Sequence, residues 1–191
     1  NNLKSIVLPE GVESIGRTAF YQSPLEDITL SKSLRTIGKS AFAECKSLSE
    51  VVIPDGVQTI GDGAFLGCKG LRSVTMSDSV TSLGALCFNE CEALESVRLS
   101  DNITTILNST FDWCTSLREL NIPSKLEVVD CYAFCACAAL PDITLPDGLK
   151  SIDEYAFMSC YEFTEIDIPE GVTLMGQNCF GDCPKLKRAS L

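Results

Sequence analysis

The sequence predicts a solenoid, a fold in which short parallel-strand coils of equal length stack into one elongated array. Three columns of residues predict it. Phenylalanine recurs every 23 residues from Phe42 to Phe180, and leucine or phenylalanine recurs at the same interval from Leu25 to Leu186. Seven cysteines keep this interval: Cys45, Cys68, Cys91, Cys114, Cys137, Cys160 and Cys183. A fixed period of about 20 to 50 residues indicates stacked repeats, each of which buries its apolar side against the next.

The repeats account for nearly the whole chain. Eight full repeats begin at Leu3, Leu25, Leu48, Leu71, Leu94, Leu117, Leu140 and Phe163, and a truncated ninth begins at Leu186. The first repeat has 22 residues, because one residue is missing between Tyr21 and Pro24, and the others have 23. We expect residues 1–191 to form a single repeat domain. Because the chain begins and ends inside a repeat, we also expect it to be an excerpt of a longer protein.

Each repeat opens with a predicted short strand. The segment from Leu48 to Ile53 places apolar residues at Leu48, Val51 and Ile53, the alternation that is typical of a half-buried strand. Equivalent segments in the other repeats include Ile143 with Leu145. Consecutive strands must pair in parallel, because each is reached only after a full coil of chain. A proline such as Pro54 often follows, and it ends the strand because it lacks an amide donor.

The returning side of each coil carries the pattern V-x-x-I-G, as at Val57, Ile60 and Gly61. We expect the apolar pair to face inward and the glycine to permit a sharp bend. The following Ala-Phe pair, as at Ala64 and Phe65, lies too close to the next strand for a long helix, so a single helical or 3₁₀ turn is predicted. The phenylalanines should stack along the array, each pair contributing about 0.5–1.5 kcal/mol beyond its burial.

The unit L-x-x-I-x-I-P-x-x-V-x-x-I-G-x-x-A-F-x-x-C-x-x resembles the BspA-like class of leucine-rich repeat, and the resemblance covers essentially the whole chain. It implies a leucine-rich repeat solenoid, a right-handed β/α-type superhelix with a parallel concave β-sheet and short 3₁₀ or irregular convex segments. The family consists largely of bacterial and protist surface or secreted proteins associated with adhesion and protein binding. The resemblance therefore implies a cell-surface or secreted location.

Composition excludes several kinds of function. The chain holds 26 acidic and 15 basic residues, a net charge of −11, which disfavours nucleic acid and anionic lipid as partners. There is no histidine, so Ser-His and Cys-His nucleophilic catalysis is excluded and most catalytic zinc sites are disfavoured. No apolar run approaches the roughly 20 residues that span a bilayer, and no signal peptide is present. We expect no cofactor and no enzymatic activity.

The cysteine column has three interpretations: buried free thiols, disulfides or metal ligands. Neighbouring strands lie within disulfide range, but equivalent side chains of successive coils point the same way, and an odd number cannot pair fully. We expect buried, structural thiols. Cys87 and Cys179 replace the alanine of the Ala-Phe pair, while Cys131 and Cys135 lie near Cys137 in a spacing that matches no common zinc motif. Whether any of these four forms a disulfide stays open. Many unpaired thiols also favour a reducing compartment, so a cytoplasmic location is not excluded.

The third and fifth residues of each repeat should point outward from the strands, where they are free to vary and to recognise a partner. The candidate ligand-binding residues on this concave face are Asp27, Glu50, Thr75, Arg98, Glu119, Asn121, Asp142, Glu165 and Asp167. The alternative interpretation is a solvated sheet face that charge keeps soluble. A second acidic column, which includes Glu10, Asp78 and Asp101, follows the proline position; it fits turn chemistry or, less readily, calcium binding.

The convex segments of repeats five to eight carry Trp113, Tyr132, Tyr155, Met158 and Tyr161. These side chains either dock a neighbouring domain or cover an irregular layer. The leading functional hypothesis is a non-enzymatic module that binds a protein or a glycan on its concave face. The alternative is a passive spacer. The sequence does not give the oligomeric state, although open strand edges at both ends predict capping segments or end-to-end contacts.

Overall fold

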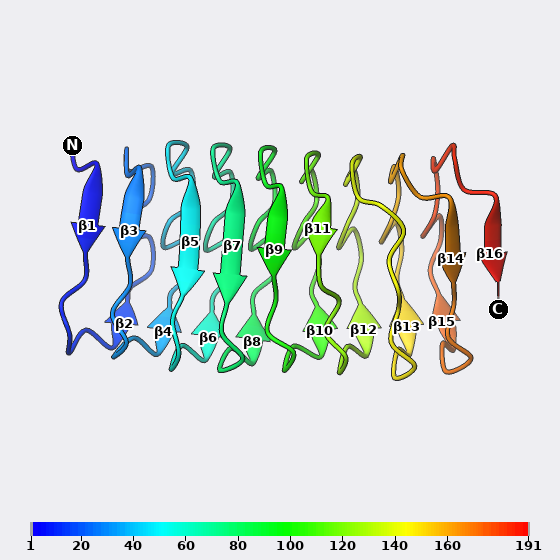
Figure 1. The fold of residues 1–191 in the computed structure, drawn as a ribbon, viewed down its shortest axis with the longest axis horizontal. Coiled ribbons are helices and arrows are strands. Elements are labelled where there is room, and N and C mark those ends of the chain that lie inside the picture. Colours follow the sequence, from blue (N-terminus) through cyan, green and yellow to red (C-terminus); the bar gives the residue numbers. More distant parts are fainter. Residues whose placement is uncertain (1, 191) are drawn as a thin grey trace.

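The computed structural model describes residues 2–190 and shows a stack of parallel-strand coils (Figure 1). One row of strands forms the front of Figure 1, and we call this side the strand face. Its strands are β1 (Ser5–Val7), β3 (Asp27–Thr29), β5 (Glu50–Ile53), β7 (Ser73–Met76), β9 (Ser96–Arg98), β11 (Glu119–Leu120), β14 (Glu165–Asp167) and β16 (Arg188–Ser190). Val51 pairs with Val74 and Val74 with Val97, so the register advances by one repeat from coil to coil. The predicted stacked parallel-strand repeat fold is confirmed.

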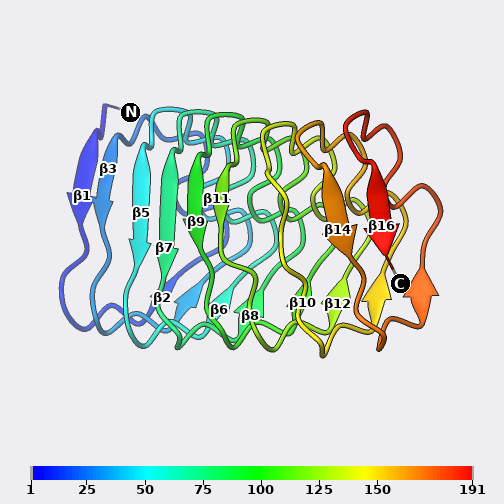
Figure 2. The same cartoon turned by 45° about the vertical axis from the view of Figure 1, so that its right-hand side comes forward.

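The returning side of the coils forms a second row of two-residue strands, which Figure 2 separates from the first. They are β2 (Ser14–Ile15), β4 (Thr36–Ile37), β6 (Thr59–Ile60), β8 (Ser82–Leu83), β10 (Thr105–Ile106), β12 (Val128–Val129), β13 (Ser151–Ile152) and β15 (Leu174–Met175). Thr59 pairs with Ser82 and Ile60 with Leu83, again in parallel. The inward isoleucine of the V-x-x-I-G pattern was predicted. The ladder that its backbone forms was not.

The third side of each coil, around the Ala-Phe pair, consists of consecutive turns. Residues 2–190 contain no α- or 3₁₀-helix, so the predicted helical turn is wrong in this detail. The amides of Gly63, Phe65 and Gly67 donate to carbonyl oxygens of the next coil at 2.8–2.9 Å. Positive φ angles of 55° at Gly63 and 66° at Gly67 aim the alternate amides along the array. We call this side the turn face. No part of residues 2–190 is a helix long and apolar enough to cross a lipid bilayer.

The glycine of the V-x-x-I-G pattern serves close packing more than bending. Gly61 does not have a positive φ angle. A Cβ atom at this position would lie 2.7 Å from the amide nitrogen of Lys39 in the preceding coil. A Cβ atom and a backbone nitrogen do not approach this closely in proteins, so a side chain at Gly61 would require the neighbouring coil to shift. The expectation of a sharp bend is therefore replaced by a requirement for close approach.

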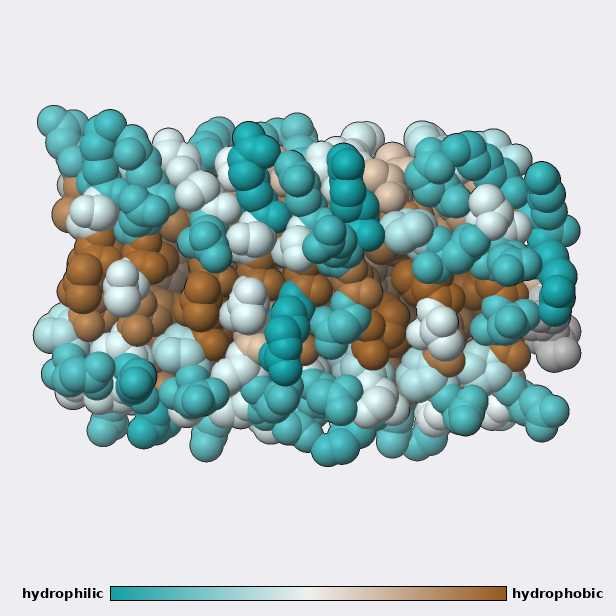
Figure 3. Space-filling model, in the orientation of Figure 1, coloured by the Kyte–Doolittle hydropathy of each residue, from teal (hydrophilic) through white to brown (hydrophobic). Residues whose placement is uncertain are grey.

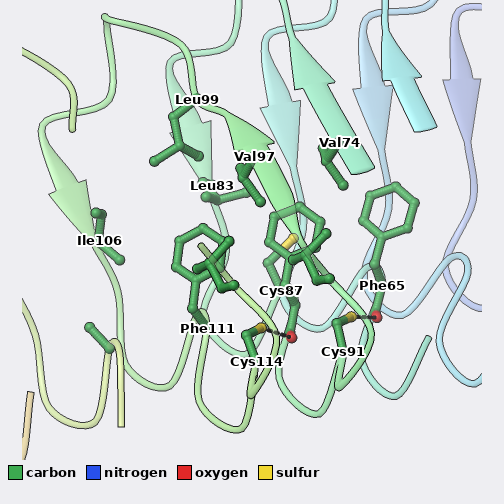
Figure 4. Packing of buried hydrophobic residues seen from close by; sticks show 14 of the residues in the cluster. Phe65, Val74, Leu83, Cys87, Cys91, Val97, Leu99, Ile106, Phe111 and Cys114 are labelled. Atoms are coloured by element: carbon green, nitrogen blue, oxygen red, sulfur yellow. Dashed lines mark hydrogen bonds between the residues drawn. The ribbon is translucent and has the colours of Figure 1, made fainter. Parts of the chain in front are cut away.

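The core is a continuous stack that runs the length of the array. Rings at successive phenylalanines lie nearly parallel, with centroids 5.3 Å apart for Phe42 and Phe65 and 5.5 Å for Phe88 and Phe111. Phe65 and Phe111 are fully buried, as predicted (Figure 4). Six cysteines of the 23-residue column are also buried: Cys45, Cys68, Cys91, Cys114, Cys137 and Cys160. The amide of each one from Cys45 to Cys137 donates to the carbonyl oxygen of the phenylalanine in its own coil. The 23-residue interval thus appears in space as aligned internal columns.

The strand face is interrupted at two places in the array, and the larger interruption lacks a strand. Residues 142–145, which correspond to β7 in the fourth repeat, form no strand, and the sheet is split between β11 and β14 (Figure 1). The predicted strand at Ile143 and Leu145 is therefore wrong. Pro141 explains the gap, because the equivalent Arg72, Glu95 and Arg118 each donate their amide to the preceding coil and proline cannot. The sheet also breaks between β3 and β5.

Candidate functional site

The outward side chains of the strand face are polar and differ from coil to coil, while the inward ones repeat. In β5 the burial alternates along the strand, with Glu50 and Val52 exposed and Val51 and Ile53 buried. Figure 3 shows this face, where hydrophilic side chains stand over a band of apolar residues. Alternation of this kind follows from the two-residue period of a strand. The third and fifth residues of the repeats therefore form two lines of variable side chains that run along the outside of the strand face.

All nine candidate residues are exposed on the strand face. Asp27, Glu50, Thr75, Arg98, Glu119, Glu165 and Asp167 lie in strands, whereas Asn121 follows β11 and Asp142 lies in the interruption. Register places Glu50, Ser73, Ser96 and Glu119 in one line across four coils. The structure thus brings the predicted residues onto one surface. It does not gather them into a single enclosed site.

Four of the nine residues bond to a neighbouring coil; one of them is Asp167, whose carboxylate pairs with Arg188 at 3.6 Å. The Oδ1 atom of Asn121 accepts the amide of Leu99 at 2.7 Å, and its Nδ2 atom donates to the Leu99 carbonyl at 3.2 Å. The carboxylate of Asp142 accepts the Thr164 amide at 2.6 Å, the Thr164 hydroxyl and the Glu165 amide. Asn121 and Asp142 therefore replace backbone ladder bonds where the sheet is irregular. A ligand would have to compete for these side chains.

Arg98 is the fourth of these residues and the cation in the middle of the face. Its guanidinium donates to the carbonyl oxygen of Met76 and to the carboxylate of Asp78 at 3.2 Å. Arg98 lines a shallow groove of about 580 Å³ together with Val52, Thr75 and Asp78. The groove combines a paired cation, a hydroxyl and an exposed valine. Its volume exceeds that of two other hollows on this face, about 320 and 180 Å³.

The acidic column after the proline position links the coils. Asp78 accepts the amide of Asp101 at 3.1 Å, and Asp101 accepts the amide of Ser124 at 2.7 Å. These amide donors, together with Arg98 for Asp78 and the Ser124 hydroxyl for Asp101, hold the pKa of both carboxyl groups below the ordinary value. Turn and ladder chemistry accounts for this column. In residues 2–190 no three carboxylate or thiol side chains stand close enough to hold a metal ion.

The turn face carries features that the sequence analysis raised and one that it missed. The rings of Tyr132 and Tyr155 stack with centroids 4.9 Å apart, and Trp113 is 55% exposed. The missed feature is a column of polar residues on the turn face, which consists of Asn89, Asp112 and Cys135. The Nδ2 atom of Asn89 donates to Asp112 at 3.2 Å. Burial, with the Asp112 carboxylate nearby, raises the pKa of Cys135 to about 11. The spacing of 23 residues between Asn89 and Asp112 was the signal that could have revealed it.

Comparison with known families decides the identity of the repeat. The profile of the BspA type leucine-rich repeat region matches six copies, over residues 1–95 and 81–191. The chain belongs to the BspA-type leucine-rich repeat family. Among curated protein sequences there is no match.

Solved structures share the fold of this BspA-type array. A leucine-rich repeat protein from Eubacterium ventriosum is 25% identical with a TM-score of 0.77, covering 98% of this chain and 59% of its own. The Treponema pallidum leucine-rich repeat protein is 27% identical with a TM-score of 0.67, covering 96% and 78%. A leucine rich cell surface protein from Faecalibacterium prausnitzii is 23% identical with a TM-score of 0.64, covering 100% and 70%. The chain spans about three-fifths of the E. ventriosum structure, so it matches only part of that protein.

Proposed function

We propose that this BspA-type array is a non-enzymatic binding module whose strand face takes a protein or glycan ligand, as part of a cell-surface or secreted protein. The contrast between inside and outside carries the proposal. The inward columns repeat one residue type, such as phenylalanine at Phe65, Phe88 and Phe111, whereas the outward column of Thr75, Arg98 and Asn121 changes at every coil. A rigid scaffold that varies only its outward residues is suited to recognition.

Family membership supports the binding role and the proposed location. Proteins of the leucine-rich repeat family generally bind partners or serve as structural elements. The F. prausnitzii protein with the same fold is described as a cell surface protein, and that description belongs to that protein. That this chain is itself part of a cell-surface or secreted protein is our proposal, and it is independent of the proposed binding role. Immunolabelling of intact cells that express the full-length protein tests it.

The binding proposal is tested by charge reversal on the strand face. The variant combines Glu50→Lys, Glu119→Lys and Glu165→Lys, three exposed residues. We expect it to lose binding to whichever member of a panel of immobilised glycans and extracellular proteins the native chain binds, with Tm changed by less than about 2 °C. The matched control reverses three exposed acids away from the strand face, Glu13 on the returning side and Glu154 and Asp182 on the turn face. Unchanged binding by the strand-face variant would remove this face as the site.

A passive spacer is the second candidate, and the continuity of the core favours it. Stacked rings link Phe20 to Phe180 through every coil, even across the interruption of the sheet. Such a rod sets a fixed distance between whatever lies at its ends. Deleting two whole repeats from the full-length protein would alter cell attachment if the array is a spacer, whereas the charge-reversal variant would leave attachment intact.

A further inference from the structure

Besides the break between β3 and β5, the strand face opens between β11 and residues 141–144. Inward side chains of the strand face are buried in the neighbouring coils, for example Val74, Val97 and Ile166. The equivalent Leu120 and Ile143 are only partly buried, although they lie well inside the array. Apolar surface is therefore exposed on both sides of the interruption. Of the other interior coils, the second also leaves its inward residue, Ile28, partly buried beside the break between β3 and β5, whereas Val51, Val74 and Val97 are buried.

The missing ladder bonds explain the opening. In the fifth coil the amides of Glu95 and Ser96 both donate to the carbonyl oxygen of Arg72. One coil further the amides of Arg118 and Glu119 donate to the Glu95 carbonyl in the same way, but no backbone amide of residues 140–145 donates to the equivalent Arg118 carbonyl, two coils beyond Arg72. Pro141 has no amide hydrogen at that position. With no strand to close the sheet, the front of the seventh coil stands apart from β11.

The opening is a groove of about 320 Å³, which we call the coil-six groove. Leu120, Ile122, Pro141 and Ile143 supply aliphatic walls, and Arg118 and Asp142 stand at its edge. This volume is at the small end of the range typical of ligand sites and fits one large side chain with its backbone. Aliphatic walls suit an apolar side chain. A sugar ring would prefer aromatic faces and amide groups.

Arg118 supplies an unpaired positive charge at the edge of the groove. In the same column Lys4 pairs with Glu26 at 2.7 Å, and Arg72 pairs with Glu95 at 3.1 Å. The next residue after Arg118 in this column is Pro141, which has no charge to offer. Within residues 2–190 Arg118 forms no ion pair, and its Nε atom donates to the Ser116 carbonyl at 3.4 Å. A guanidinium free at its two terminal nitrogens matches a carboxylate in geometry.

Asp142 does not cancel this charge at the groove. Its two oxygens accept donors from Thr164 and Glu165 in the eighth coil, on the side away from Arg118. The carboxylate is thereby committed to the scaffold. The chemistry left for a ligand is a set of aliphatic side chains, the polar groups that line the groove between them, and one cation at the edge.

We propose that the coil-six groove binds an apolar side chain that stands next to a carboxylate, as at the C-terminal residue of a protein partner. The inference rests on the proposed binding role of the strand face and deepens it, because it favours protein over glycan as the ligand. The apolar side chain packs among Leu120, Ile122 and Ile143. The carboxylate accepts two hydrogen bonds from Arg118.

The decisive variant is Pro141→Glu. It restores an amide where the neighbouring coils have one, and it gives Arg118 the partner that Glu95 gives Arg72. We expect the ladder to close and the groove to disappear, with slower amide exchange at residues 141–143 and an unchanged or higher Tm. The matched control is Ser49→Glu, the same acidic side chain at the equivalent position of the third repeat, which leaves the groove intact.

The probe is N-acetylleucine, followed by chemical-shift changes in the native chain and both variants. We expect millimolar binding that perturbs Leu120, Ile122 and Ile143, loss of these shifts in Pro141→Glu and their retention in Ser49→Glu. In Arg118→Gln the affinity should fall roughly tenfold. N-acetylleucine methylamide, which lacks the carboxylate, should bind about equally weakly to both the native chain and Arg118→Gln.

Three results would overturn the proposal: no shifts at the groove, retained binding in Pro141→Glu, or equal affinity in Arg118→Gln. Perturbation of the groove by glucuronic acid in place of N-acetylleucine would also overturn it, since the site would then be a glycan site. The broader binding role fails separately. It fails if the triple reversal at Glu50, Glu119 and Glu165 leaves the binding of whole ligands unchanged.

Discussion

The thiol of Cys91 donates a hydrogen bond to the carbonyl oxygen of Phe65, one coil earlier, at a sulfur–oxygen distance of 3.2 Å (Figure 4). The same carbonyl accepts the amide of Cys68, which lies in its own coil, at 3.2 Å. Every cysteine of the column repeats the arrangement, from Cys45 at 3.0 Å to Cys183 at 3.2 Å. The thiols from this column are buried, as predicted, except for the partly buried Cys183, and each also links its coil to the one before. That donor role was not predicted.

The first prediction concerns this bond. Replacing Cys91 by alanine removes both the donor and buried volume, so we expect a loss of about 1–2 kcal/mol in the free energy of unfolding. Serine keeps a donor in the same position, so Cys91→Ser should be more stable than Cys91→Ala. Urea unfolding followed by circular dichroism measures both.

The control for this prediction is Cys87→Ala. Cys87 occupies the column that holds Ala41 and Ala64 in earlier coils, so alanine should be accepted there with a loss below about 1 kcal/mol. If Cys91→Ala proved as stable as Cys91→Ser, volume alone would explain the column and the hydrogen bond would be irrelevant.

The second prediction concerns thiol reactivity. Burial raises the pKa of the Cys91 and Cys114 thiols far above the ordinary value, so almost none of either is thiolate near neutral pH. Cys131, Cys135 and Cys183 are only partly buried. Mass spectrometry after brief iodoacetamide treatment at pH 8 should find these three labelled first, at a rate that increases with pH. Labelling of Cys91 at the same rate as Cys131 would show that the coils open readily.

The third prediction concerns the polar column on the turn face. The Oδ1 atom of Asp112 is buried without a hydrogen-bond donor, and burial raises the pKa of this carboxyl above its ordinary value of 3.8. Because the pKa of Asp112 is higher in the folded chain than in the unfolded chain, the protonated carboxyl contributes stability at pH below its ordinary pKa. This contribution is lost as the pH rises through the folded-state pKa. Asp112→Asn is uncharged at every pH. It should raise the Tm at pH 7 by roughly 1–2 °C, a small effect because the group is half exposed.

The pH dependence separates this explanation from a packing effect. The gain in Tm from Asp112→Asn should shrink when both proteins are compared at pH 4, where the native carboxyl holds more protons. An equal gain at pH 4 and pH 7 would contradict the electrostatic account. Asp182→Asn, at an exposed carboxylate in the last turn segment, is the control and should change neither Tm.

The residues that could be predicted from the sequence are those that repeat. Phe65 and Phe88 occupy one column whatever the local backbone does, so the 23-residue interval was enough to place them in the core. The turn face could not be predicted in this way, because Trp113 and Tyr132 adopt positive φ angles of 62° and 57° that bulky residues disfavour. Coil-to-coil bonds impose those angles. Their cause lies in contacts between repeats rather than in any one repeat.

The candidate site divides along the same line. Outward exposure of Glu50 and Glu119 follows from strand alternation and was predicted. The hydrogen bonds that Asn121 and Asp142 form with the backbone of neighbouring coils were not predicted, because they occur where the sheet is interrupted. Pro141 was the available signal, since a proline at the position of Arg118 removes a ladder donor. Departures from the repeat pattern, such as Pro141, therefore determine which outward side chains bond to a neighbouring coil.

The last prediction follows from the bonds of Asp142. Reversal at Glu50, Glu119 and Asp142 would be expected to act alike if all three were solvated face residues. Asp142 instead accepts two amides and a hydroxyl from the eighth coil. We therefore expect Asp142→Lys to lower the free energy of unfolding by about 1 kcal/mol, while Glu119→Lys changes it by less than about 0.5 kcal/mol. Thermal unfolding at pH 7 measures both.

The pH profile gives this prediction its sharpest form. Burial alone would raise the pKa of Asp142, but the hydrogen bonds from Thr164 and Glu165 outweigh it and hold the pKa below the ordinary 3.8. Because the pKa of Asp142 is lower in the folded chain than in the unfolded chain, the ionised carboxylate contributes stability at pH above its ordinary pKa. This contribution is lost as the pH falls through the folded-state pKa. The native chain should therefore lose Tm faster than Asp142→Asn as pH falls below about 4. Equal slopes would mean that the ionised carboxylate contributes nothing to holding the eighth coil, which the β13–β15 ladder and the phenylalanine stack would then hold without it.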